Sequence, residues 1–309
     1  MQNKNPLVTI ITVVRNAEDT IARTISSALN QKNVSFEVLV WDGLSTDRTV
    51  EQIKTFGDRV RFYSGKDSGV YDAMNKAFPL AKGKWILFLN ADDYFLHPLA
   101  LEKLLIPTSD PKVDYVCGEA KMLFGLKRWK PKTLTDFDFF IGNPSNHQAY
   151  LCKKDIYTKL NGFNIKFRYS ADVDFMFRVI QKGYLGKSIQ EPVVHYSLGG
   201  LSTKNVGKGV SELESIMAHF LNSDLEFARE ARLVFHEGRY PRKSFLVNLA
   251  SRKLSESQWR QILLYFGSKV SAESTSFASK LFSFFKVFLI NMIKKAVFLI
   301  LSLLPKRVL

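Results

Sequence analysis

Short apolar runs that alternate with segments of helical spacing constrain the fold more than any other feature of this sequence. The runs are Leu7–Val14, Phe36–Trp41, Val60–Tyr63 and Trp85–Leu89. Between them, helices are expected from the N-cap Asn16 through Leu29, from Ser45 through Phe56, and from Asp67 through Ala81. Strands that alternate with helices predict an α/β fold with a mostly parallel sheet, right-handed crossovers and flanking helices.

The later part of the chain shows a weaker pattern. Strands are expected over Val113–Leu123 and Ala149–Cys152, and helices over Lys154–Leu160 and from Ser170 or Asp172 onward. The basic segment Lys127–Pro131 is expected to form an exposed loop. The two cysteines, Cys117 and Cys152, lack the spacing of a zinc site and fit a reducing compartment, where both would be small buried apolar residues.

The strand over Trp85–Leu89 ends abruptly in the polar residues Asn90, Asp92 and Asp93. Its unbroken apolar run suits a strand covered on both faces, and the carboxyl ends of such strands are where open α/β sheets bind ligands. The acids could therefore hold a cation. Alternatively, they could cap a helix that starts after His97, because Asn and Asp are favourable N-caps.

Pairs of acids also end other predicted elements, so that three pairs could converge at one edge of the sheet. The pairs are Asp42 with Asp47, Asp92 with Asp93, and Asp172 with Asp174. The sequence contains neither G-x-G-x-x-G after the first strand nor G-x-x-x-x-G-K-[ST], so it lacks the usual phosphate-binding loops. A divalent cation between carboxylates and a diphosphate would hold a nucleotide in another way.

Five motifs in one order resemble the family-2 glycosyltransferases of GT-A fold over roughly residues 6 to 205. They are Val8-Thr-Ile-Ile-Thr-Val-Val-Arg-Asn16, Asp42-Gly-Leu-Ser-Thr-Asp47, Lys66-Asp-Ser-Gly-Val-Tyr-Asp-Ala-Met-Asn75, Phe88-Leu-Asn-Ala-Asp-Asp93 and Ser170-Ala-Asp-Val-Asp174. The chain is most similar to bacterial enzymes that build O-antigen and exopolysaccharide repeat units. The resemblance implies inverting transfer of a hexosyl or N-acetylhexosaminyl group from a nucleoside-diphosphate sugar, expected to be a UDP-sugar, to a saccharide hydroxyl.

The same resemblance implies where the donor and its cation bind. The nucleotide-sugar site would comprise Val14, Arg15, Asn16, Asp42, Asp67, Asp72, Asn75, Asn90, Ala91 and Asp92, with Asp42 accepting a hydrogen bond from a uracil-type edge. Mg²⁺ or Mn²⁺ would bind Asp92, with Asp93 beside it, and His195 would complete the coordination shell. The alternative is that His195 is a structural residue. Asn90 stands where the family has Asp, and its amide oxygen can still coordinate a hard cation.

For catalysis, the resemblance assigns the general base to Asp172, the Asp of a Glu-Asp pair in which Ala171 replaces the Glu. Asp174 would point elsewhere on the helix. The alternative for both acids is a charge that complements the dipole at a helix N-terminus. His147 and Gln148 occupy the place of a His-Gln pair that would orient the acceptor or a diphosphate, unless His147 is merely solvated.

The basic C-terminal part indicates an anionic surface as partner. Residues 239–309 carry +11 of the net charge of +15. Within Phe277–Leu304, the residues Lys280, Lys286, Lys294 and Lys295 interrupt the apolar sequence and share one side of a helical wheel, which predicts an amphipathic interface helix and not a membrane span. A core or oligomer helix is the alternative, so a homo-oligomer stays open, and nucleic acid is not expected.

Together these features predict three regions: a catalytic domain over 1–205, a helical extension over 206–276, and a membrane-interface helix over 277–309. No charged-then-apolar leader marks secretion, so we expect a peripheral protein on the cytoplasmic face of the inner membrane, acting on a lipid-linked saccharide. Two other functions remain open. One is a non-catalytic nucleotide- or saccharide-binding scaffold, suggested by Asn90 and Ala171; the other is a nucleotidyltransferase, whose Gly-rich phosphate loop is missing.

Overall fold

The computed structural model describes residues 5–122, 127–129, 132–142, 144–198, 200, 204–239 and 241–270. Two compact units divide the chain. The first comprises Met1–Thr135 and Asn143–Ile216, and the second comprises Asp136–Gly142 and Met217–Leu309. The division falls inside helix α9 (Val206–Phe220), whereas the predicted boundary at residue 205 precedes that helix.

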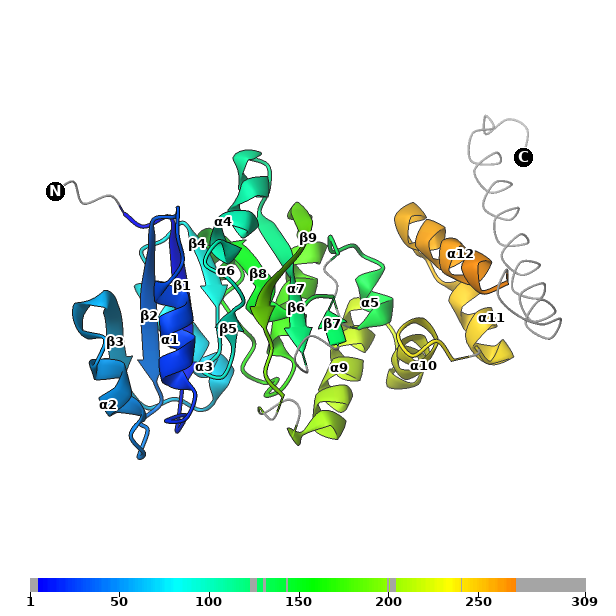
Figure 1. The fold of residues 1–309 in the computed structure, drawn as a ribbon. Helices are drawn as coiled ribbons and strands as arrows, with labels where there is room; N and C mark the ends of the chain where they lie inside the picture. The colour runs from blue at the N-terminus through cyan, green and yellow to red at the C-terminus, as the bar shows by residue number, and fades with distance from the viewer. Residues whose placement is uncertain are drawn as a thin grey trace, which may run out of the picture. The chain divides into compact units, whose positions relative to one another are not determined.

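A single mixed sheet organises the first unit (Figure 1), with strand order β3-β2-β1-β4-β8-β6-β9-β5 and with β7 paired to β6. The strands are β1 (Val8–Val14), β2 (Phe36–Asp42), β3 (Val60–Ser64), β4 (Trp85–Phe88), β5 (Tyr94–Phe95), β6 (Tyr115–Met122), β7 (Lys127–Trp129), β8 (Tyr150–Lys153) and β9 (Gly186–His195).

The prediction of a mostly parallel sheet holds only for its N-terminal half. Strands β3, β2, β1 and β4 pair in parallel, as do β6 and β9, but β8 is antiparallel to both β4 and β6, β5 to β9, and β7 to β6. Antiparallel pairs need no crossover helix, which is why the strand-helix alternation fades after Asp93. The predicted loop at Lys127–Pro131 was wrong at its start, because β7 adds to the edge of β6.

Helices cover the sheet on both faces. One face packs α1 (Ile21–Leu29), α2 (Thr49–Lys54) and α4 (Ala100–Leu105), and the other packs α3 (Val70–Ala77), α6 (Lys154–Lys159) and α7 (Ala171–Gln181). Strand β1 shows the period-two pattern that supports both layers: Val8, Ile10 and Val14 enter the first core, whereas Ile11 and Val13 enter the second. Figure 1 shows α1 lying across β1.

Two predictions about helix starts are corrected by the structure. Helix α1 begins at Ile21 with Thr20 as N-cap, while Asn16 has a positive φ of 52° and does not cap it. Helix α4 begins at Ala100 with Leu99 as N-cap, so Asn90, Asp92 and Asp93 do not cap a helix. The capping alternative for these polar residues is therefore wrong.

The helix expected through Ala81 is shorter than predicted. Helix α3 ends at Ala77 and continues as a 3₁₀ turn, η2 (Phe78–Leu80), in which Pro79 has no N–H to donate. The predicted burial of both cysteines is confirmed: Cys117 in β6 and Cys152 in β8 are free thiols with no exposed surface.

The described part of the second unit is helical. It contains α5 (Asp138–Ile141), the end of α9, α10 (Leu225–Phe235), α11 (Lys243–Ser251) and α12 (Glu256–Val270). Phe235 lies at its centre, with ring contacts to Phe137, Phe140, Phe245 and Phe266. None of the helices described here is long and apolar enough to cross a bilayer. The predicted interface helix over 277–309 lies outside the described residues.

Candidate active site

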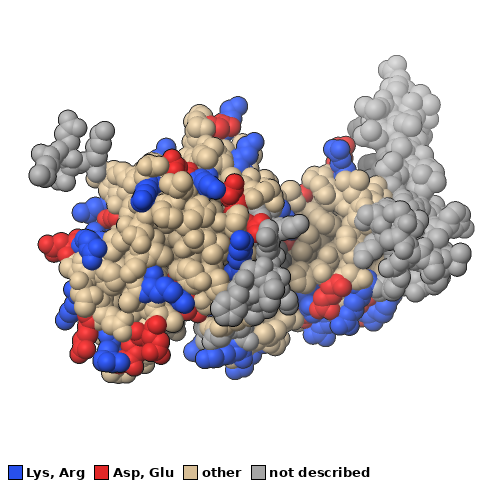
Figure 2. Space-filling view, viewed as in Figure 1, with Lys and Arg blue, Asp and Glu red and all other residues tan. Residues whose placement is uncertain are grey.

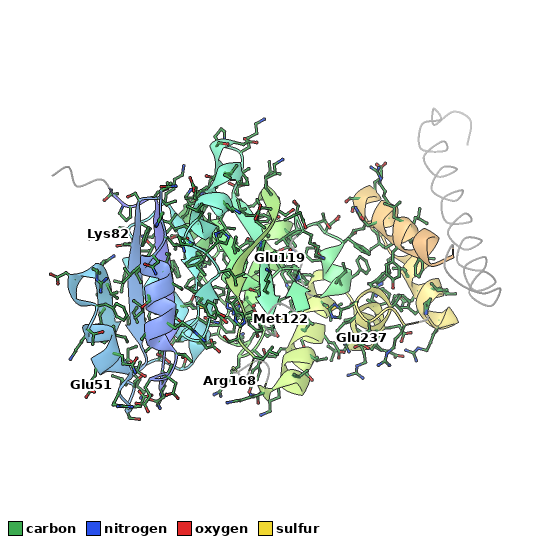
Figure 3. All side chains as sticks on the ribbon, in the orientation of Figure 1. Glu51, Lys82, Glu119, Met122, Arg168 and Glu237 are labelled. Carbon is green, nitrogen blue, oxygen red and sulfur yellow. The ribbon has the colours of Figure 1, made fainter. Side chains whose placement is uncertain are left out.

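A cavity of about 650 Å³ opens in the first unit where β1 and β4 end. Its walls come from the loop after β1, the start of α3, the loop after β4, the turn before β8, the segment before α7 and the segment after β9. Figure 3 shows Arg168, one lining residue, at the end of the sheet where β1 and β4 finish, and Lys82, which precedes β4, at the other end. The cavity thus lies at the carboxyl ends of parallel strands, as the sequence predicts.

The loop after β4 is fixed to its surroundings through its backbone carbonyls. The Thr24 hydroxyl donates to the carbonyls of Ala91 and Asp93, at 2.9 and 2.7 Å. Arg23 Nη2 and Ser197 Oγ both donate to the carbonyl of Asp92, at 2.9 and 2.6 Å. These contacts hold the loop from α1 on one side and from the segment after β9 on the other.

The two carboxylates of this loop differ in surroundings. Asp93 is 1% exposed, and its Oδ1 accepts from the Ser197 N–H at 2.7 Å, while Oδ2 has no hydrogen-bond partner among the described residues. Burial and the neighbouring charge of Asp92 raise the pKa of Asp93 to about 7. Burial also raises the pKa of Asp92, which lines the cavity beside Gly200.

This loop fits a hard cation. The loop contains two adjacent carboxylates, Asp92 and Asp93, and the amide oxygen of Asn90 is buried without a hydrogen-bond partner among the described residues. Among those residues, however, no group of three His, Cys, Asp or Glu side chains could hold a metal ion by itself. A cation here would therefore need oxygens from its ligand as well.

The structure does not bring His195 to the cavity lining. It pairs with Tyr94 across β9 and β5, and its ring stacks on that tyrosine with centroids 4.6 Å apart. Burial and the charge of Arg23 lower the pKa of His195.

Asp172 lies in the first turn of α7, directly behind residues that line the cavity. Its Oδ1 accepts from the Tyr71 hydroxyl at 2.7 Å, and its Oδ2 lies 3.0 Å from Nδ1 of His147. Burial tends to raise the pKa of Asp172, but the hydrogen bond and the electrostatic attraction of His147, with the hydrogen bond from Tyr71, outweigh it and hold that pKa below its usual value. The carboxylate is 17% exposed and ionised at neutral pH.

Asp174 makes different contacts from Asp172 and points elsewhere, as the sequence predicts. Its carboxylate accepts from Arg178 Nε at 2.8 Å, and the same guanidinium donates to the carbonyls of Leu160 and Gly162. Asp174 therefore holds α7 to the turn after α6, away from the cavity.

Six of the predicted nucleotide-sugar residues, at the ends of β1 and β4, line the cavity, and the other four do not. Val14, Arg15, Asn16, Asn90, Ala91 and Asp92 line it, as do the predicted acceptor-side residues His147 and Gln148. Asn16 also joins two loops, because its backbone N–H donates to Ser45 Oγ and its side-chain oxygen accepts from the Thr46 N–H.

The four remaining acids and amides have partners within the protein. Asp42 is 1% exposed and accepts from Ser64 Oγ and the Ser45 N–H, and its contact with a uracil-type edge stays a prediction. Asp67 accepts from Trp41 Nε1 and the Gly69 N–H, Asp72 from Ser68 and Lys76, and Asn75 binds the backbone of Phe163 through both amide atoms. None of the four is among the residues that line the cavity.

Several residues that the sequence interpretation missed complete the site. Arg168 and Lys204 line the cavity, and with Arg15 they supply three cations. Tyr71 lies inside one of the quoted motifs but received no role there. Glu212 of α9 accepts backbone N–H bonds from Arg168, Tyr169 and Ser170, at 2.8 to 3.1 Å. No sequence signal links Glu212 to a loop some forty residues earlier.

Acids are also part of the cavity lining. Glu18, Asp19 and Asp47 line it together with Asp92 and Asp93. Figure 2 shows acidic side chains gathered at the α2 end of this unit, where Glu51 is labelled in Figure 3. These acids favour cations, and the cations Arg15, Arg168 and Lys204 of the same lining offset part of their charge.

Comparison with known proteins decides the family. Residues 9–177 match the sequence model described as "Glycosyl transferase family 2". The chain belongs to this family. A "PGL/p-HBAD biosynthesis glycosyltransferase" of Mycobacterium bovis is 32% identical to this glycosyltransferase over 211 residues, which cover 66% of its chain and 82% of the mycobacterial protein.

Solved structures agree on the fold. A structure of S. aureus TarS 1–349 in complex with UDP-GlcNAc matches this glycosyltransferase with a TM-score of 0.60 and 17% identity, covering 91% of the present chain and 89% of the TarS 1–349 chain. The mannosyltransferase PcManGT from Pyrobaculum calidifontis, in complex with GDP-Man and Mn²⁺, gives 0.58 and 15%, covering 94% and 88%. The expected GT-A-like α/β fold is confirmed.

Proposed function

We propose that this glycosyltransferase moves a hexosyl or N-acetylhexosaminyl group, with inversion, from a UDP-sugar to a saccharide hydroxyl. One observation carries the proposal: an ionised carboxylate, Asp172, lies beside the same cavity whose floor holds Asp92 and Asp93. A base and a cation-binding loop in one site are the two requirements of such a transfer.

In the proposed step, Asp172 accepts the proton of the acceptor hydroxyl. The acceptor oxygen forms its bond to the anomeric carbon as the bond from that carbon to the diphosphate oxygen breaks, and the nucleoside diphosphate leaves. Tyr71 and His147 donate to the two oxygens of the carboxylate, which orients it while each oxygen keeps a lone pair.

The donor diphosphate would bind between the loop after β4 and the three cations Arg15, Arg168 and Lys204. Asp92 would hold Mg²⁺ or Mn²⁺, with Asp93 supporting it. When bound, such a cation neutralises the charge that develops on the leaving diphosphate. The acids of the cavity lining support this assignment, because a nucleotide that carries a divalent cation meets less repulsion from them than a bare one.

We further propose that the acceptor is a lipid-linked saccharide of a surface polysaccharide or glycolipid. The names of relatives support this: PGL/p-HBAD biosynthesis for the mycobacterial protein, and teichuronic acid biosynthesis for Bacillus subtilis TuaG, which is 37% identical over 97 residues. The basic tail over 277–309 would then bring the enzyme to the cytoplasmic membrane face as a peripheral protein.

The test is turnover with a panel of UDP- and GDP-sugars, with and without Mn²⁺, measured as release of nucleoside diphosphate. For the active donor, D172N should lower kcat by about 10²- to 10⁴-fold, the usual contribution of a general base. Donor affinity should be unchanged.

The matched control is D174N, two residues along the same helix, which should weaken folding but leave kcat near the original value. Full activity of D172N would refute the assignment of the base. Cation-dependent nucleotide binding without any turnover would favour the non-catalytic scaffold, and release of pyrophosphate would favour the nucleotidyltransferase.

A further inference from the structure

Three side chains from distant parts of the chain form one hydrogen-bonded series beside the cavity. Asn90 Nδ2, at the end of β4, lies 3.1 Å from Nε2 of His147, and Nδ1 of His147 lies 3.0 Å from Oδ2 of Asp172. Both ring nitrogens of His147 are therefore engaged, one by an amide and one by a carboxylate. All three side chains are partly buried, which strengthens such contacts.

The partners decide which nitrogen carries the proton. Nδ1 faces an ionised carboxylate, which only accepts, so Nδ1 must donate. A neutral imidazole then has a lone pair on Nε2, and that lone pair needs a donor. The amide of Asn90 supplies one when its nitrogen faces the ring, whereas the reversed amide would place oxygen against the lone pair. In the structure the amide nitrogen of Asn90 faces Nε2, so the contacts fit a ring with its proton on Nδ1 and its lone pair on Nε2.

An aspartate at position 90 could contact Nε2 only as an acceptor. A carboxylate only accepts, so it would require a proton on Nε2 and hence a doubly protonated ring between two carboxylates. Asn90, which departs from the family motif, is thus matched to His147. This contact gives a physical reason for the departure that the sequence alone does not offer.

We propose that Asn90 is a positioning residue for the base: its amide holds His147 in the Nδ1–H tautomer, and His147 in turn orients the carboxylate of Asp172. The inference rests on the proposed role of Asp172 as base. Asn90 acts through His147, so it contributes to the proton transfer without touching the acceptor. Oδ1 of Asn90 is buried and has no hydrogen-bond partner among the described residues.

The first test is spectroscopic and needs no turnover. Long-range ¹H–¹⁵N spectra of the ¹⁵N-histidine-labelled full chain report the tautomer of each ring, and H147Q identifies the His147 signals by their loss. We expect an Nδ1–H ring in the unmodified protein, a mixture of tautomers in N90A, and protonation of Nε2 in N90D. N248A, an exposed asparagine on α11, is the control that should change nothing.

The second test is a double-mutant cycle in kcat with the active UDP-sugar. N90A should lower kcat by about ten- to a hundredfold, the range seen when an outer hydrogen-bond partner of a site is removed. Because both residues act as one unit, N90A/H147A should lose no more than the stronger single variant. If Asn90 contacted the donor directly, N90A would instead raise KM. N90Q keeps the amide and should recover part of kcat.

Three results would overturn the inference: an Nε2–H tautomer in the unmodified protein, an unchanged tautomer in N90A, or losses in kcat that multiply in the double variant. Failure of the proposed function looks different. In that case D172N would keep full transfer, while the His147 spectra would still respond to N90A.

Discussion

At the scale of single residues, the buried carboxyl of Asp93 has the most direct measurable consequence. It is 1% exposed, one oxygen has no partner among the described residues, and its pKa of about 7 reflects burial and then the charge of Asp92. The folded protein therefore keeps a proton on this group at pH values where an unfolded chain, with an Asp pKa of about 3.9, has lost it.

Stability should consequently fall as pH rises. Between about pH 4 and pH 7 the folded state binds one proton more than the unfolded state at Asp93, so this group favours folding most below pH 4 and loses that contribution through pH 7. Urea unfolding at intervals from pH 4 to 8 should show a shallower decline for D93N than for the original protein. D58N, at an exposed site, should reproduce the original slope; equal slopes for D93N would contradict the assignment.

Motifs identified many candidate residues but not what each one touches. Asp92 and His147 reach the cavity, and Asp172 lies just behind it: Asp92 follows a predicted strand, His147 precedes one, and Asp172 starts a predicted helix. Asp42 stands at such a position too, yet it is bound by Ser45 and Ser64. Whether a carboxylate faces ligand or protein depends on hydroxyls brought from other elements, which strand and helix patterns do not reveal.

At the scale of elements, α9 supports the segment that leads into α7. The Glu212 carboxylate accepts three backbone N–H groups at residues 168–170, and Ser170 Oγ donates to the carbonyl of Gly209. Without Glu212 these N–H groups would have to find water. The placement of Arg168 and Tyr169 at the cavity therefore depends on α9.

Replacing this carboxylate should weaken both folding and activity. We expect E212A to lose about 1–3 kcal/mol of unfolding free energy, since hydrogen bonds to a charged group are among the stronger ones. The value of kcat/KM should fall as well. Urea titration and steady-state kinetics measure both, and S215A, on an exposed position of α9, is the matched control. An unfolding free energy of E212A equal to that of the original protein would show that residues 168–170 keep their conformation without Glu212.

Element types in the N-terminal half followed from the sequence because strands and helices there alternate with clear periods. The short strands β5 and β7 could not be predicted, since two or three residues carry no measurable period. Such strands form because an edge of β9 or β6 is available to pair with them. Their existence depends on tertiary contacts.

At the scale of the whole molecule, we predict that the segment 277–309 directs the enzyme to a membrane surface. In a helical wheel of Phe277–Leu304 the lysines fall on one side and Leu and Phe on the other, a pattern expected to bind anionic membranes. Deleting it should move the protein from the membrane pellet to the supernatant, with turnover on a soluble acceptor retained. Sedimentation with vesicles containing anionic lipid measures this, and unchanged pelleting of the truncated protein would refute the prediction.

The two buried thiols can report how often the central sheet opens. Cys117 and Cys152 lie on the paired central strands β6 and β8 without exposed surface. A thiol reagent can reach them only when those strands separate from their helices, so the labelling rate should track opening of the sheet. Donor binding at the cavity should slow labelling of both cysteines together, which mass spectrometry can follow without adding any probe.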